Sequence, residues 1–104
     1  MGAVKGGWIL LIPNSDPAQH RATIKSEKYE GTMVFTPTVD KAVEVCQELI
    51  QKDGLNFLTL CPAFTHEDVA KIAASVRGTP INVCRGDGPG LLKEFQDMKN
   101  AGWF

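Results

Sequence analysis

Cys61 and His66 are the residues whose types and spacing come closest to a catalytic pair. Cys61 ends an apolar segment and precedes a predicted helix, whose N-terminus would favour the thiolate. His66 follows five residues later and is the candidate base for that thiolate. The adjacent Glu67 and Asp68 oppose a negative sulfur, and cysteine is often buried simply as a small apolar residue. We favour the structural role for Cys61 and keep both residues as catalytic candidates.

Arg85 and the glycine-rich segment 86–90 form a second candidate, a cradle for an anion. Backbone N–H groups in such a turn, and at the start of the helix predicted after it, point at a ligand, and Arg85 adds positive charge. The segment lacks the Gly-Lys-Ser/Thr of a phosphate loop, and Asp87 carries the wrong charge. A simple turn between a strand and a helix is the interpretation that we favour.

We expect no metal site and no bound cofactor. Cys61, Cys84 and His66 could in principle bind a metal, but the spacings typical of zinc sites are absent. We expect Cys46, on the apolar stripe of a predicted helix, and Cys84 to belong to the core. Electron transfer with a bound flavin is a further possible function, and its only support is the parallel sheet described next.

Apolar segments alternate with amphipathic segments along the chain. Strands are predicted at residues 7–13, 31–37, 55–61 and 80–84, and helices at 38–53, 65–78 and from residue 91 to about residue 100. The continuous apolar run in 7–13 is typical of a strand buried on both faces. This order is typical of parallel βαβ units. We predict a single α/β domain, residues 1–104, with a small four-stranded, mainly parallel sheet, βαβ crossovers and about three main helices.

Two stretches are less regular. Asp16 before Pro17, with Gln19 three residues after Asp16, predicts a short capped helical turn. Residues 22–30 fit either an irregular crossing or a short edge strand, and both interpretations remain open.

The predicted topology places several polar side chains at one edge of the sheet. In open parallel sheets, ligands bind beyond the carboxyl ends of the strands. The residues that follow those ends come from loops far apart in the sequence. The ligand-binding candidates at this edge are Asn14, Asp16, Thr36, Thr65, Arg85 and Asp87.

The segment Trp8-Ile9-Leu10-Leu11-Ile12-Pro13, with Asp16-Pro17 and His20-Arg21, resembles a family of small bacterial α/β proteins known only as a domain of unknown function. The resemblance continues through 42–45 and Leu60-Cys61 and spans most of the chain. It implies the fold and carries no activity with it.

Charge and cysteine content narrow the possible partners. The 11 basic and 12 acidic residues give a net charge of −1, without the basic patch that nucleic acids or anionic membranes attract. Three cysteines, with no C-x-x-C spacing and no secretory signal, indicate reduced thiols in the cytoplasm. We therefore expect no nucleic-acid or membrane partner and a cytoplasmic location.

Two functions remain. The first is a small-ligand-binding or interaction protein, which fits the lack of paired carboxylates or a triad. We expect it to be a homo-oligomer, because Trp103 and Phe104 add apolar surface to a small sheet. The alternative is an enzyme acting on a small anionic metabolite, with Arg85 holding the anion and Cys61 or His66 performing the chemistry.

Overall fold

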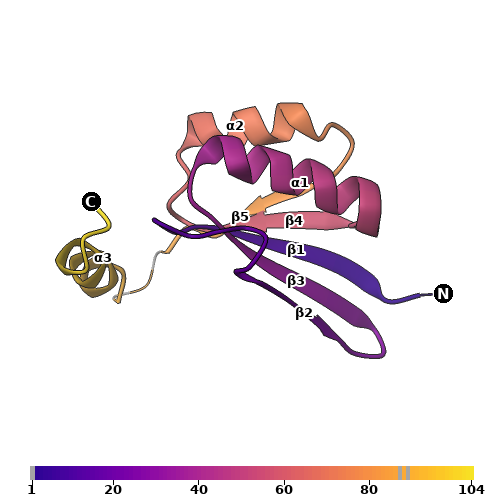
Figure 1. Cartoon of the computed structure of the whole chain (residues 1–104), viewed down its shortest axis with the longest axis horizontal. Coiled ribbons are helices and arrows are strands. Elements are labelled where there is room, and N and C mark those ends of the chain that lie inside the picture. The colour runs from indigo at the N-terminus through magenta and orange to yellow at the C-terminus, as the bar shows by residue number, and fades with distance from the viewer. Residues whose placement is uncertain (1, 87, 89) are drawn as a thin grey trace.

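The computed structural model describes residues 2–86, 88 and 90–104. It contains a five-stranded sheet with two helices on one face and a third helix beyond one end (Figure 1). The elements are β1 (Val4–Leu11), β2 (Arg21–Lys25), β3 (Tyr29–Thr36), α1 (Val39–Asp53), β4 (Phe57–Leu60), α2 (His66–Ser75), β5 (Ile81–Val83) and α3 (Leu91–Asn100).

The strands lie in the order β2-β3-β1-β4-β5. β3, β1, β4 and β5 run parallel, and β2 pairs antiparallel with β3. The α/β class, the mainly parallel sheet and the three helices are therefore confirmed. The carboxyl ends of the four parallel strands meet at one edge, the edge on the α3 side in Figure 1.

The prediction of four strands is wrong by one strand. The additional strand, β2, falls in the stretch that the sequence left open between a crossing and an edge strand, and it pairs with β3 in a hairpin. It carries no apolar run, because an edge strand with one neighbour tolerates polar residues such as Arg21, Thr23 and Lys25. The predicted short capped turn at Asp16 is confirmed, because the N–H of His20 donates to the Asp16 carbonyl and the N–H of Ala18 donates to the Asp16 carboxylate. The Asp16 N–H donates to Nδ1 of His20 and not to Gln19.

Both α1 and α2 begin close to the predicted positions, but α2 ends at Ser75, earlier than the predicted residue 78. The Thr38 side chain accepts a hydrogen bond from the N–H of Lys41 at the start of α1, and Gly54 ends that helix with a φ of 64°. At the start of α2, Thr65 and Asp68 form a reciprocal capping box.

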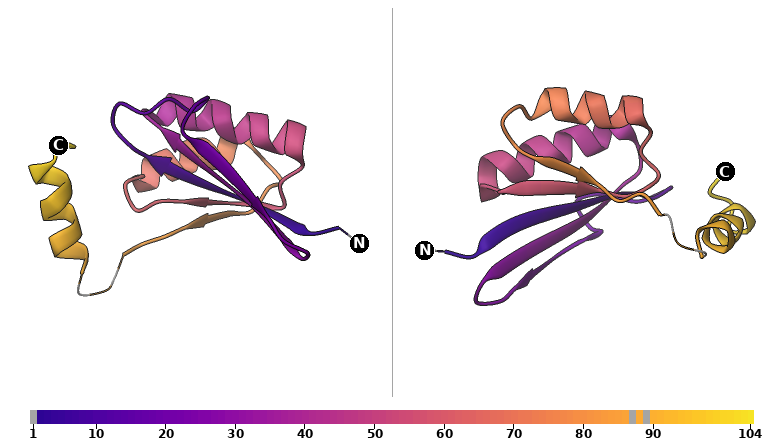
Figure 2. Two further views of the ribbon diagram at one scale, coloured as in Figure 1. Left: turned by 60° about the horizontal axis from the view of Figure 1, so that its bottom comes forward. Right: turned by 180° about the vertical axis from the view of Figure 1, so that it is seen from behind.

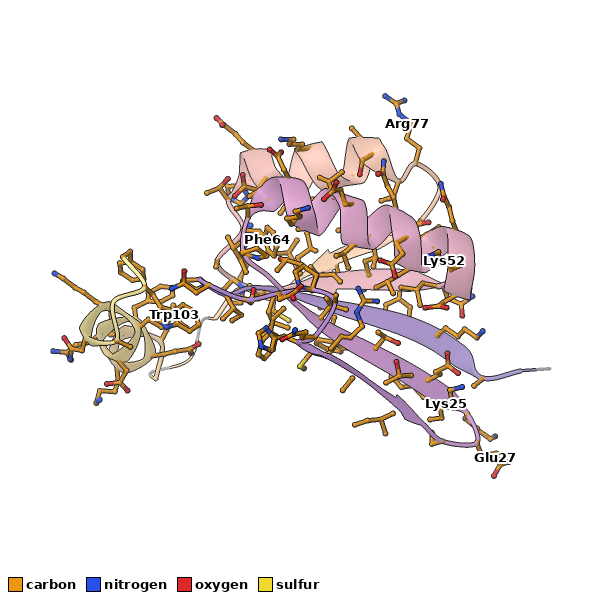
Figure 3. The ribbon with its side chains drawn as sticks, in the orientation of Figure 1. Lys25, Glu27, Lys52, Phe64, Arg77 and Trp103 are labelled. Atoms are coloured by element: carbon orange, nitrogen blue, oxygen red, sulfur yellow. The ribbon has the colours of Figure 1, made fainter. Side chains whose placement is uncertain are left out.

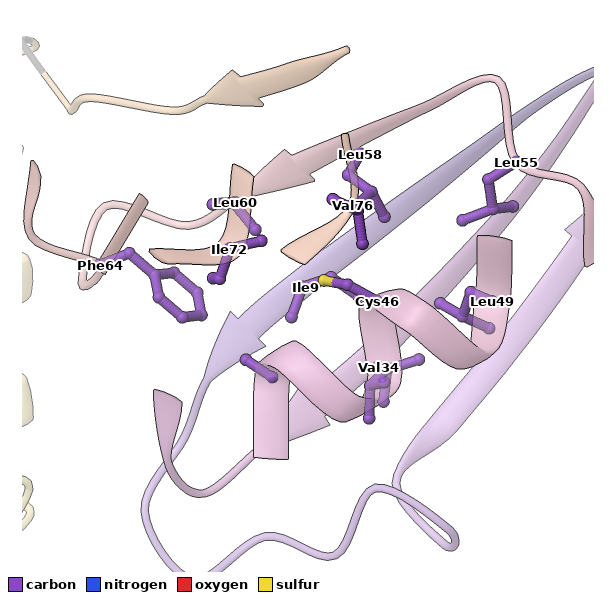
Figure 4. Close-up of a cluster of buried hydrophobic side chains, with 12 residues drawn as sticks. Ile9, Val34, Cys46, Leu49, Leu55, Leu58, Leu60, Phe64, Ile72 and Val76 are labelled. Atoms are coloured by element: carbon purple, nitrogen blue, oxygen red, sulfur yellow. The ribbon is translucent and has the colours of Figure 1, made fainter. Parts of the chain in front are cut away.

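The core lies between the sheet and the pair α1 and α2, which cover the same face (Figures 1 and 2). Figure 4 shows its buried side chains, among them Ile9, Val34, Cys46, Leu49, Leu58, Leu60, Phe64 and Ile72. The predicted core position of Cys46 is confirmed, and burial raises the pKa of its thiol to about 12. The predicted core position of Cys84 is wrong, because this residue lies just beyond the short edge strand β5 and is exposed.

The second face of the sheet is not covered by a helix in the described part of the chain (Figure 2). The expectation that the first strand is buried on both faces is therefore wrong. Ile9 is fully buried, whereas the neighbouring Trp8 points to the opposite face and is 38% exposed.

α3 lies apart from the other two helices. None of its residues, all of which are described, is buried. Its Phe95 ring makes an edge-to-face contact with Phe104 of the C-terminal tail, with ring centroids 6.5 Å apart.

Candidate functional site

A cleft of about 720 Å³ separates the carboxyl edge of the sheet from α3 and the C-terminal tail. Its volume lies within the range of about 300–1,000 Å³ that is usual for small-molecule sites. Trp103 lies between α3 and the body of the protein (Figure 3). The lining residues are Leu11, Pro13, Pro37, Pro62, Ala63, Phe95, Met98, Trp103 and Phe104.

Three prolines form much of the sheet side of this cleft. Pro13, Pro37 and Pro62 each lie shortly after the carboxyl end of a different parallel strand, β1, β3 and β4. Proline stops a strand and has no N–H. In other proteins, loops at this edge of a parallel sheet bind anions through their backbone N–H groups. The three proline positions cannot contribute such a group. The chemistry of the lining is therefore apolar.

Cys61 lies beside the cleft. It borders an adjoining hollow of about 150 Å³ that is also lined by Phe95, Met98 and Trp103. Its side chain is partly buried, and its Sγ accepts a hydrogen bond from the N–H of Leu11 at 3.3 Å. His66 is the exposed first residue of α2, and the hydrogen bonds of the described residues do not join it to Cys61.

The two predicted threonine ligands have structural roles. Thr36 is fully buried, and its hydroxyl donates to the carbonyl of Leu10 at 2.9 Å. Thr65 accepts from the N–H of Asp68 at 3.1 Å within the capping box of α2. Neither side chain lines the cleft.

Asn14 and Asp16 belong to the turn that follows β1. Asn14 adopts a left-handed conformation with a φ of 59°. The Asp16 carboxylate accepts from the N–H of Ala18, and this residue borders a separate hollow of about 280 Å³. That hollow also contains Arg21 and Glu48, which form a salt bridge at 3.0 Å.

Arg85 supports one wall of the cleft. Its Nη1 donates to the carbonyl of Phe64 at 2.7 Å and to the carbonyl of Pro62 at 3.2 Å. These bonds hold the loop after β4, which contains the lining residues Pro62 and Ala63. Arg85 as a residue is exposed. Asp87 lies outside the described residues, and so does part of the predicted anion cradle.

The structure thus places Cys61 and Arg85 next to the cleft and gives Thr36, Thr65 and Asp16 roles in the fold. Sequence reasoning missed the side of the cleft that α3 and the tail provide. The available signal was the apolar series Phe95, Met98, Trp103 and Phe104. In the described part of the chain, no cluster of three or more His, Cys, Asp or Glu side chains could hold a metal ion.

The fold and the cleft define a small α/β protein with an apolar candidate site at the carboxyl edge of a mainly parallel sheet. Residues 4–97 match the model of a family described as "Family of unknown function (DUF6506)", and the chain belongs to that family. The resemblance to a family of unknown function is thereby confirmed. No curated protein and no solved structure matches the chain. Among the helices of the described residues, none is long and apolar enough to cross a membrane.

Proposed function

We propose that the protein binds a small apolar or aromatic ligand in the cleft between the strand ends and α3. The observation that carries this proposal is the lining, in which every residue is apolar. Burial of apolar ligand surface there stabilises the complex by roughly 25 cal/mol per Å². Trp103 and Phe95 add aromatic surfaces on which a ring can stack.

The anionic ligand expected from the sequence has one support in the geometry. Arg85 is exposed and donates a hydrogen bond to the carbonyl of Pro62, which lines the cleft. A ligand with an apolar body and a terminal carboxylate would bury the body in the cleft and place its charge near this guanidinium. The anion is then a peripheral group and not the main source of affinity.

An enzyme remains the second candidate function. Its support is the position of Cys61, partly buried in the hollow that adjoins the cleft. Under this alternative, Cys61→Ala abolishes turnover and leaves ligand binding intact.

Ligand binding is tested by a thermal-shift screen with two sets of compounds, small aromatic or aliphatic molecules and small anionic metabolites. A ligand at about 100 times its Kd stabilises the native state by about 2.7 kcal/mol, which raises the Tm of a domain of this size by about 10 °C. We expect such a shift from apolar compounds. Met98→Glu should abolish it, because a carboxylate then enters the apolar cleft.

The matched control is Leu92→Glu, which adds the same charge to the same helix at a residue that is 83% exposed. This variant should keep the full shift. The proposal is wrong if apolar compounds give no shift, or if a shift persists in Met98→Glu.

A homo-oligomer in the cytoplasm is also part of the proposal, with no nucleic-acid or membrane partner. The oligomer is supported by large apolar side chains of the sheet that remain exposed, including Ile24 and Met33. The location is supported by three free cysteines, of which Cys84 is exposed, as expected in a reducing compartment.

A further inference from the structure

We propose that the sheet face opposite α1 and α2 is the interface of a homodimer, in which two copies pack sheet against sheet. The inference rests on the proposed homo-oligomer and names its surface. This face, called the open face below, is separate from the helix-covered core.

Strand alternation and register define the open face. Successive side chains of a strand point to opposite faces. Because Ile9 is in the core, its neighbours Trp8 and Leu10 point away from the helices. The register extends this assignment across the sheet, since Trp8 pairs with Met33 on one side and Thr59 on the other. The open-face residues of the strands are Val4, Gly6, Trp8, Leu10, Ala22, Ile24, Tyr29, Gly31, Met33, Phe35, Phe57, Thr59 and Asn82.

These strand positions of the open face, all of them described, include no Lys, Arg, Asp or Glu. The strand residues of those four types are Lys5, Arg21, Lys25 and Glu30, and alternation places them on the helix-covered face. A sheet face that remains in water is normally the polar one. Here Ile24 is 77% exposed, and Val4 and Met33 are close to half exposed. A contiguous apolar surface of this kind marks an interaction site.

The aromatic side chains of the open face are held in place within a single copy. Gly6 pairs with Gly31, and a Cβ at Gly6 would lie 2.2 Å from the Tyr29 hydroxyl and 2.9 Å from the Phe57 ring. The two glycines therefore allow these rings to lie close to the backbone. The Trp8 Nε1–H donates to the Tyr29 hydroxyl at 3.1 Å. Since the surface is ordered before association, little conformational entropy is lost when a partner binds.

The size of the open face is close to the lower limit for a specific interface between two copies. Strands about 4.8 Å apart, at about 3.3 Å per residue, give these five strands a flat footprint of roughly 450 Å², and the relief of the side chains makes their accessible area larger. Specific interfaces need about 500 Å² or more per partner. A ten-residue helix, about 15 Å long and 10 Å wide, covers only about 150 Å². α3 alone is therefore too small to cover the open face, and it lies at the carboxyl edge instead.

The chemistry of the open face selects a second copy of the chain. A two-fold interface packs a surface patch against the same patch of the second copy, and an uncharged apolar patch is complementary to itself. Homodimer interfaces are also more apolar than other interfaces. Nucleic-acid strands stack on aromatic side chains but require Lys or Arg for the phosphates, and the strand positions of this face include neither.

The interface is tested by the mass of the full chain in solution, measured by size-exclusion chromatography with light scattering. We expect the wild type at twice the chain mass of 11.3 kDa. Met33→Glu and Ile24→Glu each place a carboxylate on the open face, where the monomer leaves it in water, so folding should be preserved by circular dichroism. Each should raise the dimer Kd by about 30-fold or more. Leu92→Glu on α3 should remain dimeric.

Tryptophan fluorescence provides a second measurement that needs no charge substitution. In a Trp103→Phe background, Trp8 is the only tryptophan. Its emission should shift to longer wavelength on dilution through the dimer Kd, as the indole becomes exposed to water.

A wild type that is monomeric at every concentration overturns both the homo-oligomer and this interface. A dimer that survives Met33→Glu and Ile24→Glu overturns only the interface, and so does a dimer that Leu92→Glu alone dissociates. The ligand-binding proposal depends on none of these outcomes, because its test is the Tm shift and the Met98→Glu variant.

Discussion

At the scale of single residues, three free cysteines occupy three different environments. Cys46 is fully buried among apolar side chains, Cys61 is partly buried beside the cleft, and Cys84 is exposed. The thiolate is the reactive form of cysteine, and burial without a positive partner disfavours it. Cys46 is therefore a packing residue, whereas Cys61 has both limited access to solvent and an N–H of Leu11 directed at its sulfur.

The buried thiol of Cys46 predicts a loss of stability at alkaline pH. Its pKa is about 12 in the folded protein, against 9.0 for the unperturbed group, so the unfolded chain releases this proton first. The stabilising effect is complete below pH 9 and decreases as the pH rises toward 12. Between pH 8 and 10, the free energy of unfolding should fall by about 1 kcal/mol from this residue alone.

The measurement is urea unfolding of the wild type and of Cys46→Ala at both pH values. Cys46→Ala is less stable at pH 8 because it leaves a cavity, but it should lose less stability between the two pH values. Equal losses in the two proteins would show that Cys46 does not carry the effect.

At the scale of elements, α3 differs from α1 in what it buries. α1 contributes Ala42, Val45, Cys46 and Leu49 to the core, whereas no residue of α3 is buried. Most helical stability in proteins comes from packing of the apolar face. The apolar residues Phe95 and Met98 of α3 line the cleft and are not buried. An ion pair between Lys93 and Asp97 lies on the surface of the same helix.

Hydrogen exchange should separate these two helices. We expect the amides of α3 to exchange through local opening, well before those of α1, whose protection should approach that of global unfolding. A ligand in the cleft should slow exchange in α3, because Phe95 and Met98 line it. Equal protection of α1 and α3 without ligand would contradict this assignment.

The helices and strands differ in how well the sequence alone predicts them. The helical spacing of apolar residues is a local signal, so the sequence alone predicts α1 and α2. β2 cannot be predicted with the same certainty, because this edge strand has no apolar run. The apolar residues 8–12 are compatible with a strand buried on both faces within one chain. They are equally compatible with a strand whose second face is buried against a partner, so the sequence alone does not predict the open face.

For the candidate site, the sequence located the edge but not the lining. The rule for parallel sheets depends only on strand order, which the βαβ pattern predicts. The cleft is completed by α3 and its tail, and their position depends on the connection after β5 and not on any local pattern. That rule selects polar residues near the strand ends and gives no role to Pro13, Pro37 and Pro62, which line the cleft.

At the scale of the whole molecule, the shape reflects the position of α3. The radius of gyration is 14.1 Å, and the longest dimension is 44 Å against 28 and 27 Å for the others. A compact chain of this length is expected to have a radius of about 13 Å. The protruding helix and the open face together leave one copy with more apolar surface in water than a small monomer usually carries.

If the homodimer forms through the open face, thermal stability should depend on protein concentration. A 100-fold increase in concentration favours the native dimer by about 2.7 kcal/mol, which corresponds to a rise in Tm of about 6 °C for two chains of this length. Calorimetry of the wild type across that range should show the rise, and Met33→Glu should show none. A Tm independent of concentration in the wild type would count against a dimer that dissociates on unfolding.

The central position of β1 has a consequence for synthesis of the chain on the ribosome. β1 is made first, but Val4 pairs with Tyr29 and Gly6 pairs with Phe57, so its two neighbours are translated later. At about 5–20 residues per second, β1 emerges roughly 3–10 s before β4. During that interval its apolar segment has at most the β2–β3 hairpin beside it. The nascent chain therefore passes through a stage in which the future centre of the sheet is an edge, and at this stage a chaperone would protect it most.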